Sequence, residues 1–311
     1  MKTRFIILSV VFLIALLLTI GYLRSGLLNL PEVPGSISDR EAGLHNLSTM
    51  AVIEKTLNET YRGEDESTIR QLETAVQTDP DNLVLGNLLR MKILKLKREW
   101  IRKLASRSEL TLEFPELLQD QPIKFFRELV ERHPSNVTKL QLSLTLVDHM
   151  LLFPALEIKA PSSVEAVEIL TDVLKEDPYY VPALYARGLN YLYRPFNLVW
   201  PEKIAAPPNA ASDDLSLCVA VGEKTGAGSD ALKSELSLAL GDAYAKEQRF
   251  NLARSWWQIA NNIARTDQLR ERVFKRLTWN DNDVRTNLED LLQHQMEDLD
   301  HPLSDLRFMW Q

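Results

Sequence analysis

The chain has 311 residues, of which 45% are hydrophobic and 25% are charged, a balance that is typical of a packed core and excludes a disordered chain. It carries 43 Asp and Glu against 36 Lys and Arg, so a general nucleic-acid-binding surface is disfavoured and we expect no nucleic-acid partner. Cys218 is the only cysteine, which excludes an intramolecular disulfide and a cysteine-based zinc site.

The first residues predict a membrane anchor. A short basic N-terminus, residues 1–4, precedes Phe5–Leu23, which has no charged side chain and is long enough to cross the hydrocarbon core as a helix. We therefore expect an uncleaved transmembrane signal anchor. A removed signal peptide is the alternative, although it would have a shorter apolar core and a small-residue cleavage motif.

The basic residues Lys2 and Arg4 lie before the span, so the positive-inside rule favours a cytoplasmic N-terminus and an exported body. This predicts a single-pass membrane protein whose body faces the periplasm from a bacterial inner membrane, or the lumen if the chain is eukaryotic. Residues 24–37 contain two Gly and two Pro and are expected to form a stalk.

From Ser38 onward, apolar residues recur at three- and four-residue intervals, which predicts helices. No run of alternating β-branched residues is long enough for a strand, so the expected fold class is all-α. We expect long connections at 107–121 and at a Pro-rich insertion, 194–212. The predicted helices span 39–61, 66–78, 82–106, 122–132, 136–152, 163–176, 182–193, 213–225, 230–246, 250–264, 267–277 and 283–297.

A repeated pattern runs through these helices. Three of them end just before Pro80, Pro134 and Pro178, and proline marks a sharp helix stop. Two later segments combine Leu and Gly with Tyr three residues after the Gly, and the second continues into Phe250, Ala253, Trp257 and Ala260. A small residue allows helices to cross closely, and a large aromatic residue fills the gap beside it. The expected repeat-packing residues are Gly188, Tyr191, Gly241, Tyr244, Ala253 and Trp257.

On these motifs, which cover about 178–262, the chain resembles the tetratricopeptide repeat family. The resemblance implies an α-solenoid of about five helix pairs over 38–277, followed by an acidic C-terminal helix and tail, 278–311. A non-repeating helical bundle is the alternative. The resemblance also implies protein binding in a concave groove lined by the first helix of each pair. Its candidate residues here are Tyr185, Leu189, Tyr193, Asp242 and Lys246.

Two further segments are candidates for interaction. The basic run 90–107 suggests a patch for anionic lipid headgroups or an acidic partner, although a solvated helix face would have the same composition. Its candidate residues are Lys92, Lys95, Arg98 and Arg102. The tail ends in Phe308, Met309, Trp310 and Gln311, and we expect it either to cap the solenoid or to be offered to another protein.

Catalytic signals are missing from the sequence. The five histidines are scattered without the spacing that places two ligands on one helix face, and no nucleotide-binding or nucleophile motif occurs. We expect no catalytic residue, cofactor or metal. The predicted function is a membrane-anchored scaffold or assembly factor that binds an unidentified protein partner. The alternative is an accessory subunit of a membrane-associated enzyme or, less favoured, such an enzyme itself.

Overall fold

The structure is a computed structural model in which every regular element among the described residues is helical. This confirms the all-α class. The described residues are 30–33, 35, 37, 43, 47–63, 65–105, 121–152, 156–194, 206–226, 228–297 and 304–310. None of the described helices is both long and apolar enough to cross a bilayer. The anchor predicted at Phe5–Leu23 lies outside these residues.

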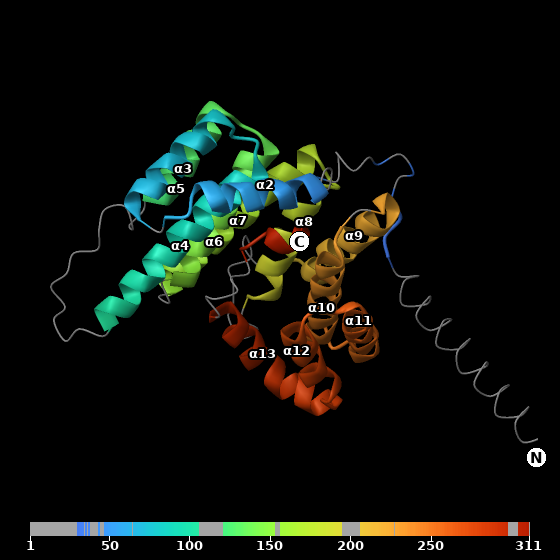
Figure 1. Ribbon diagram of the computed structural model, residues 1–311. Coiled ribbons are helices and arrows are strands. Elements are labelled where there is room, and N and C mark those ends of the chain that lie inside the picture. Colours follow the sequence, from blue (N-terminus) through green and yellow to red (C-terminus); the bar gives the residue numbers. More distant parts are fainter. Residues whose placement is uncertain are drawn as a thin grey trace, which may run out of the picture.

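The helices follow one another in a serial array (Figure 1). Each helix from α5 to α11 packs against the next one in the chain, while α4 packs against α3 and α6. Such neighbour-to-neighbour packing is compatible with a helical-repeat architecture. The elements are α2 (Leu47–Thr60), α3 (Glu66–Thr78), α4 (Leu83–Ala105), α5 (Gln121–Arg132), α6 (Asn136–Leu152), α7 (Leu156–Glu176), α8 (Val181–Leu192), α9 (Ala210–Thr225), α10 (Asp230–Lys246), α11 (Phe250–Ile263), α12 (Asp267–Leu277), α13 (Asp281–Glu297) and the short 3₁₀ helix η2 (Arg307–Met309).

Local sequence explains most helix starts. The Asp65 side chain accepts a hydrogen bond from Thr68 N at the start of α3, and Ser229 does the same for Leu232 N in α10, which is the usual N-cap arrangement. One predicted start was wrong, because α7 begins at Leu156 rather than near 163 and contains Pro161. Pro161 lies beyond the first turn, where a proline removes one intrahelical hydrogen bond and its ring crowds the carbonyl four residues earlier.

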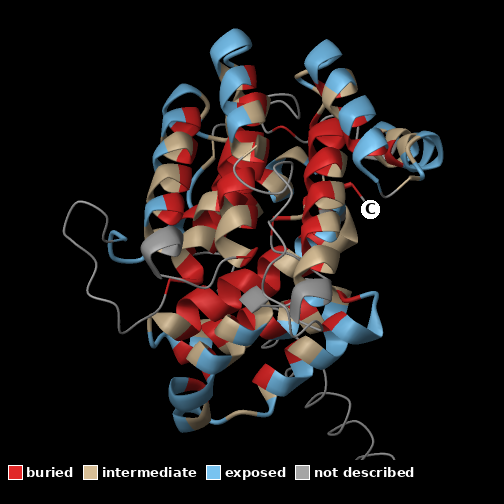
Figure 2. Cartoon of the chain, turned by 90° about the vertical axis from the view of Figure 1, so that its left-hand side faces the viewer, coloured by how far each residue is buried: buried red, intermediate tan, exposed pale blue. Residues whose placement is uncertain are grey.

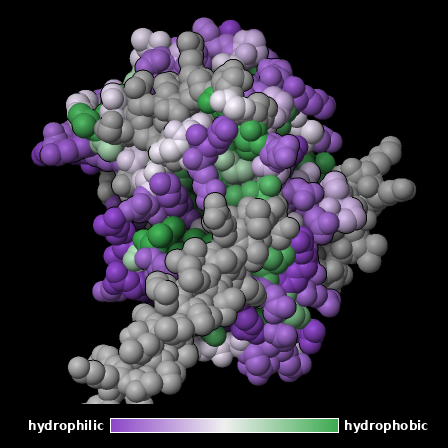
Figure 3. All heavy atoms as spheres, turned by 90° about the vertical axis from the view of Figure 1, so that its right-hand side faces the viewer, coloured by the Kyte–Doolittle hydropathy of each residue, from purple (hydrophilic) through white to green (hydrophobic). Residues whose placement is uncertain are grey.

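The buried residues lie along the faces that the helices turn toward one another, with exposed residues at helix ends and outer turns (Figure 2). A small cluster joins α3, α4, α5 and α6, and a larger one includes the start of α4 and runs from α6 to Trp310. On the face drawn in Figure 3, hydrophobic residues form small groups within a mostly hydrophilic surface. Among the described residues, the large hydrophobic side chains that are clearly exposed are Val52 and Phe274.

The chain does not end at the edge of this array. Figure 1 places the C-terminus in the middle of the molecule, among α2, α8 and α10. Helix α13 and η2 both contact α10, so the last part of the chain folds back over the inner side of the earlier helices. The candidate sites are arranged around this returning segment.

Candidate binding groove and basic pocket

The expected repeat-packing residues lie where two helix pairs cross closely. A Cβ atom added to Gly241 on α10 would lie 2.4 Å from Trp257 Cδ1 and 3.1 Å from the backbone oxygen of Ala253 on α11. A Cβ on Gly188 of α8 would lie 2.9 Å from Leu215 Cγ on α9. Glycine is therefore required for the close approach of α10 to α11, and it serves the same purpose between α8 and α9.

The two tyrosines of this set have different surroundings. Tyr244 is buried, and the Arg249 guanidinium lies 4.5 Å from its ring centroid. Tyr191 is half-buried beneath Arg194 at 5.1 Å. Both contacts have the geometry of a cation–π pair, so in each case an arginine just beyond the end of the helix packs on the tyrosine of that helix.

The candidate groove residues also lie together, but beneath other helices. Tyr185 and Leu189 are each 5% exposed, Tyr193 is 8% exposed, and Asp242 is 2% exposed. Lys246 is half-buried on α10. In this structure the five positions are part of the interior and do not form an open concave surface.

The last helices of the chain cover them. Arg276 on α12 donates from Nε and Nη2 to the two carboxylate oxygens of Asp242, at 2.6 and 2.7 Å, and Trp257 Nε1 donates to Asp242 Oδ1 at 2.9 Å. Gln295 on α13 accepts from the Tyr193 hydroxyl at 3.1 Å and from Arg276 Nη2 at 3.2 Å. These contacts bind α12 and α13 to the inner faces of α8 and α10.

Lys246 has a structural role in this arrangement. Its ammonium group donates to the backbone oxygens of Leu192 and Arg194, at 2.7 and 2.5 Å, at the C-terminal end of α8. A cation at this position suits the helix dipole. Burial lowers the pKa of Lys246 to about 8.

Beyond α13, residues 304–310 begin with a turn at Ser304, continue into the short helix η2, and lie against α2, α4 and α6. Ser304, Leu306, Met309 and Trp310 are all at most 3% exposed. Trp310 Nε1 donates to Glu54 Oε2 on α2 at 2.9 Å. We call residues 304–310 the docked tail.

The main chain of the docked tail is held by side chains of α4. Arg90 Nη2 donates to the Ser304 backbone oxygen at 2.7 Å, and Leu306 N donates to Asn87 Oδ1 at 3.0 Å. Asn87 Nδ2 also donates to Asp305 Oδ1 at 3.0 Å. Two of these three contacts reach backbone groups of the tail, so they do not depend on which side chains stand at positions 304 and 306.

These contacts are part of a buried network of hydrogen bonds and one ion pair. Arg90 donates to Asp148 Oδ2 at 2.8 Å and to Gln141 Oε1 at 2.7 Å, both on α6, and the Ser304 hydroxyl donates to Asp148 Oδ1. Burial raises the pKa of the Asp148 carboxyl, and the Arg90 charge opposes that rise. Since a buried charge requires such partners, the network ties the tail to α4 and α6 together.

Sequence reasoning missed this network, although a signal was present. Asn87 and Arg90 follow Leu83 at the spacing of one helix face, and Asp148 lies on α6, which is buried on almost every side. Polar residues on a buried helix face must find partners. The sequence did not show that Arg90 would find one of its partners, the Ser304 backbone oxygen, 214 residues later in the chain.

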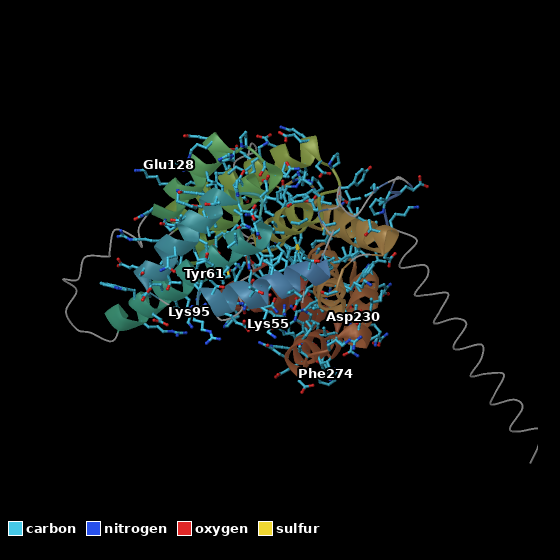
Figure 4. All side chains as sticks on the ribbon, turned by 45° about the horizontal axis from the view of Figure 1, so that its top comes forward. Lys55, Tyr61, Lys95, Glu128, Asp230 and Phe274 are labelled. Carbon is cyan, nitrogen blue, oxygen red and sulfur yellow. The ribbon has the colours of Figure 1, made fainter. Side chains whose placement is uncertain are left out.

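The four candidate basic-patch residues converge on one pocket beside the docked tail. This pocket has a volume of about 430 Å³. Lys95 and Arg102 are exposed, Lys92 is half-buried and Arg98 is buried; Figure 4 shows the Lys95 side chain at the outer edge of α4. The remaining lining residues are Glu54, Asn58, Val84, Asn87, Leu88, Met91, Leu94, Glu99, Arg307 and Trp310.

Other reactive groups are placed apart from one another. In the described part of the chain, no three His, Cys, Asp or Glu side chains are arranged to hold a metal ion. Cys218 is buried, its thiol lies 3.6 Å from the Val181 backbone oxygen, and burial raises its pKa well above the ordinary value. This thiol is therefore protonated and inert as a nucleophile.

Comparison with protein-family models, with curated proteins and with solved structures finds no match to this chain.

Proposed function

We propose that this protein is a non-catalytic scaffold that binds short segments of other proteins along the inner side of its helical array. One observation carries the proposal: α4 holds the docked tail through its backbone, with Arg90 on the Ser304 oxygen and Asn87 on the Leu306 amide. A surface that holds one short segment in this way has the chemistry to hold another.

The composition of the contact supports the same function. Leu306 and Met309 are almost completely buried, so apolar side chains supply burial while Asn87 and Arg90 supply main-chain hydrogen bonds. Peptide-binding surfaces commonly divide their contacts in this way, with pockets for side chains and polar groups for the backbone. The partner segment would contain large apolar residues two or three positions apart.

The membrane location belongs to the same proposal. Phe5–Leu23 would anchor the chain and hold the array close to the membrane, with the body on the exported side. The proposed partners are then membrane or envelope proteins whose assembly requires temporary binding. Extraction of native membranes with alkaline carbonate tests the anchor, because an anchored chain remains in the pellet and a processed one enters the supernatant.

Photo-crosslinking in the producing cells tests the binding function. A crosslinkable residue replaces Leu88, which lines the pocket beside the docked tail, in the complete chain and in a chain that ends after residue 303. We expect one or two abundant partners in the shortened chain and fewer in the complete chain, where the tail competes.

The matched control places the same crosslinker at Phe274, which is 64% exposed on α12. Identical products from positions 88 and 274, or no partner from position 88 in either chain, would contradict a binding role for the inner surface.

A further inference from the structure

The first residue of the docked tail is recognised through its hydroxyl group as well as through its backbone. Ser304 is completely buried, and its hydroxyl donates to Asp148 Oδ1 while its backbone oxygen accepts from Arg90. A residue without a hydroxyl would remove this donor from a buried carboxylate. Sites built around a hydroxyl group strongly reject ligands that lack it, so this position selects serine.

The second position is recognised by the amide of Asn87 on α4. Its nitrogen donates to Asp305 Oδ1 at 3.0 Å, and its oxygen accepts from the Leu306 backbone N–H at 3.0 Å. The same oxygen accepts from Arg90 Nη2 at 2.9 Å. Because a guanidinium group only donates, this bond fixes the orientation of the amide. The nitrogen must then face the tail, where it requires an acceptor at position 305.

Asp305 also shapes the tail itself. Its Oδ1 accepts from the Arg307 backbone N–H at 3.0 Å, and its Oδ2 accepts from Arg307 Nε at 2.6 Å. A bond from an aspartate side chain to the backbone two residues later stabilises a turn. This turn leads into η2, in which Met309 is 1% exposed, while Leu306 before it is 0% exposed. One carboxylate therefore serves both the contact with α4 and the turn.

The fourth position is different, because it is open. Arg307 is exposed and lines the pocket of about 430 Å³ together with Trp310. The docked tail leaves this volume unfilled. The contacts thus specify a serine, an aspartate and a leucine in succession, and then an apolar residue three positions after the leucine, while the residue directly after the leucine stays variable.

We propose that the partners of this site are proteins that carry the sequence Ser-Asp-Leu in an exposed segment, with an apolar residue three positions after the leucine. This inference rests on the proposed function, since it names which short segments the inner surface selects. In the 311 residues of the chain, these three residues occur in this order only at Ser304–Leu306. The docked tail is then a built-in competitor that carries the same sequence as the partner.

A second copy of the chain is a poor source of this segment. Its tail would have to displace an identical tail that is attached to the site by its own chain. An attached segment competes at an effective concentration of about millimolar, so equal affinity is not enough. A partner segment has an advantage where it also extends into the volume beside Arg307, which the tail leaves unfilled.

The test uses the complete chain with Leu306→Asp, which places a charge at a fully buried position and should release the tail. Fluorescence anisotropy in detergent micelles measures the binding of a labelled, N-acetylated peptide with the sequence of residues 304–311. We expect saturable binding, and at least tenfold weaker binding for the peptides with Ser304→Ala or Asp305→Ala, because each loses a buried polar contact.

The matched control peptide carries Arg307→Ala. Because position 307 is exposed and an exposed ion pair contributes little, this peptide should bind less than about fivefold more weakly. A second control tests the contact itself. When the chain also carries Asn87→Ala, the penalty for Asp305→Ala in the peptide should become smaller, since the donor to that carboxylate is gone.

The unaltered chain gives an independent measurement that does not depend on the folding of the Leu306→Asp variant. Excess original peptide should displace the attached tail and accelerate hydrogen exchange at the Leu306 amide, which is bonded to Asn87. The Ser304→Ala peptide at the same concentration should leave that exchange unchanged.

Equal binding of the original, Ser304→Ala and Asp305→Ala peptides would overturn the inference and leave the proposed function standing, because partner capture at position 88 does not depend on this sequence. The inference also falls if no peptide binds the Leu306→Asp chain and none alters exchange in the unaltered chain. A dimer of the unaltered chain that Ser304→Ala abolishes would assign the sequence to a second copy, and would overturn the inference as well.

Discussion

Replacement of Gly241 by alanine tests the close crossing of α10 and α11. The added methyl carbon would lie 2.4 Å from Trp257 Cδ1 and 2.6 Å from its Nε1, more than 1 Å inside normal contact distance. Trp257 is completely buried and its indole N–H is bonded to Asp242, so the ring cannot move aside without losing that bond.

The magnitude follows from three opposing effects. Overpacking in a filled core costs about 1–3 kcal/mol, and loss of the bond to a carboxylate costs about 1.5–3 kcal/mol more. The higher helix propensity of alanine returns about 1 kcal/mol. We therefore expect Gly241→Ala to lower the free energy of unfolding by about 1.5–5 kcal/mol, measured by urea unfolding of the complete chain followed by circular dichroism.

Two comparisons make the result specific. Gly188→Ala meets Leu215 Cγ at 2.9 Å and Asp214 Cβ at 3.2 Å, a smaller overlap, and should cost less, about 1 kcal/mol. In a Trp257→Leu background, Gly241→Ala should cost less than about 0.5 kcal/mol, because the obstructing ring is gone. An unchanged stability for Gly241→Ala, or the same loss with and without Trp257, would refute the packing argument.

Two other predictions concern the groove residues, and a third concerns the docked tail. Arg276→Met leaves the Asp242 carboxylate buried without its ion-pair partner and should lower the free energy of unfolding in urea by about 3–5 kcal/mol. Adding Asp242→Leu to this variant should restore most of that loss. If the two substitutions instead lower the stability additively, the result contradicts this prediction. Burial raises the pKa of Tyr193 above its ordinary value of 10.0, so its contribution to stability is complete below about pH 10 and is lost as pH rises toward the folded-state pKa. Tyr193→Phe should therefore show a shallower fall of the urea midpoint above pH 10, and an identical pH profile would count against burial of this hydroxyl. Trp310→Ala removes a nearly buried indole and should make the docked tail sensitive to protease while α10 and α11 keep their stability, an outcome that limited proteolysis distinguishes from general unfolding.

The sequence predicted the helices well because their signals are local. Periodic apolar residues and caps gave α3, α6, α10 and α12 with the same bounds that the structure has, and the Gly241 motif predicted the contact with Trp257. The start of α7 was wrong, since Ser162 and Ser163 look like caps but are buried within the helix and Ser163 bonds Asn190 instead.

The burial of the groove residues was harder to predict, because the helices that cover them, α12 and α13, come later in the sequence. The resemblance placed Tyr193 and Asp242 on an inner surface, but it carried no information on Arg276 or Gln295, which cover them. Likewise, the basic run predicted the four basic residues that line the pocket. It did not predict that α2 and Trp310 would form another part of the pocket wall. Long-range contacts of this kind follow from the assembled shape rather than from any local pattern.

Hydrogen exchange of the complete chain tests the central claim most directly, namely that the inner side of the array holds a short segment by its backbone. We expect the Leu306 amide, bonded to Asn87, to exchange far more slowly than in a free peptide of the same sequence, and Asn87→Ala to remove that protection while the amides of α10 stay protected. Exchange of residues 304–310 at the free-peptide rate in the unaltered chain would contradict the account.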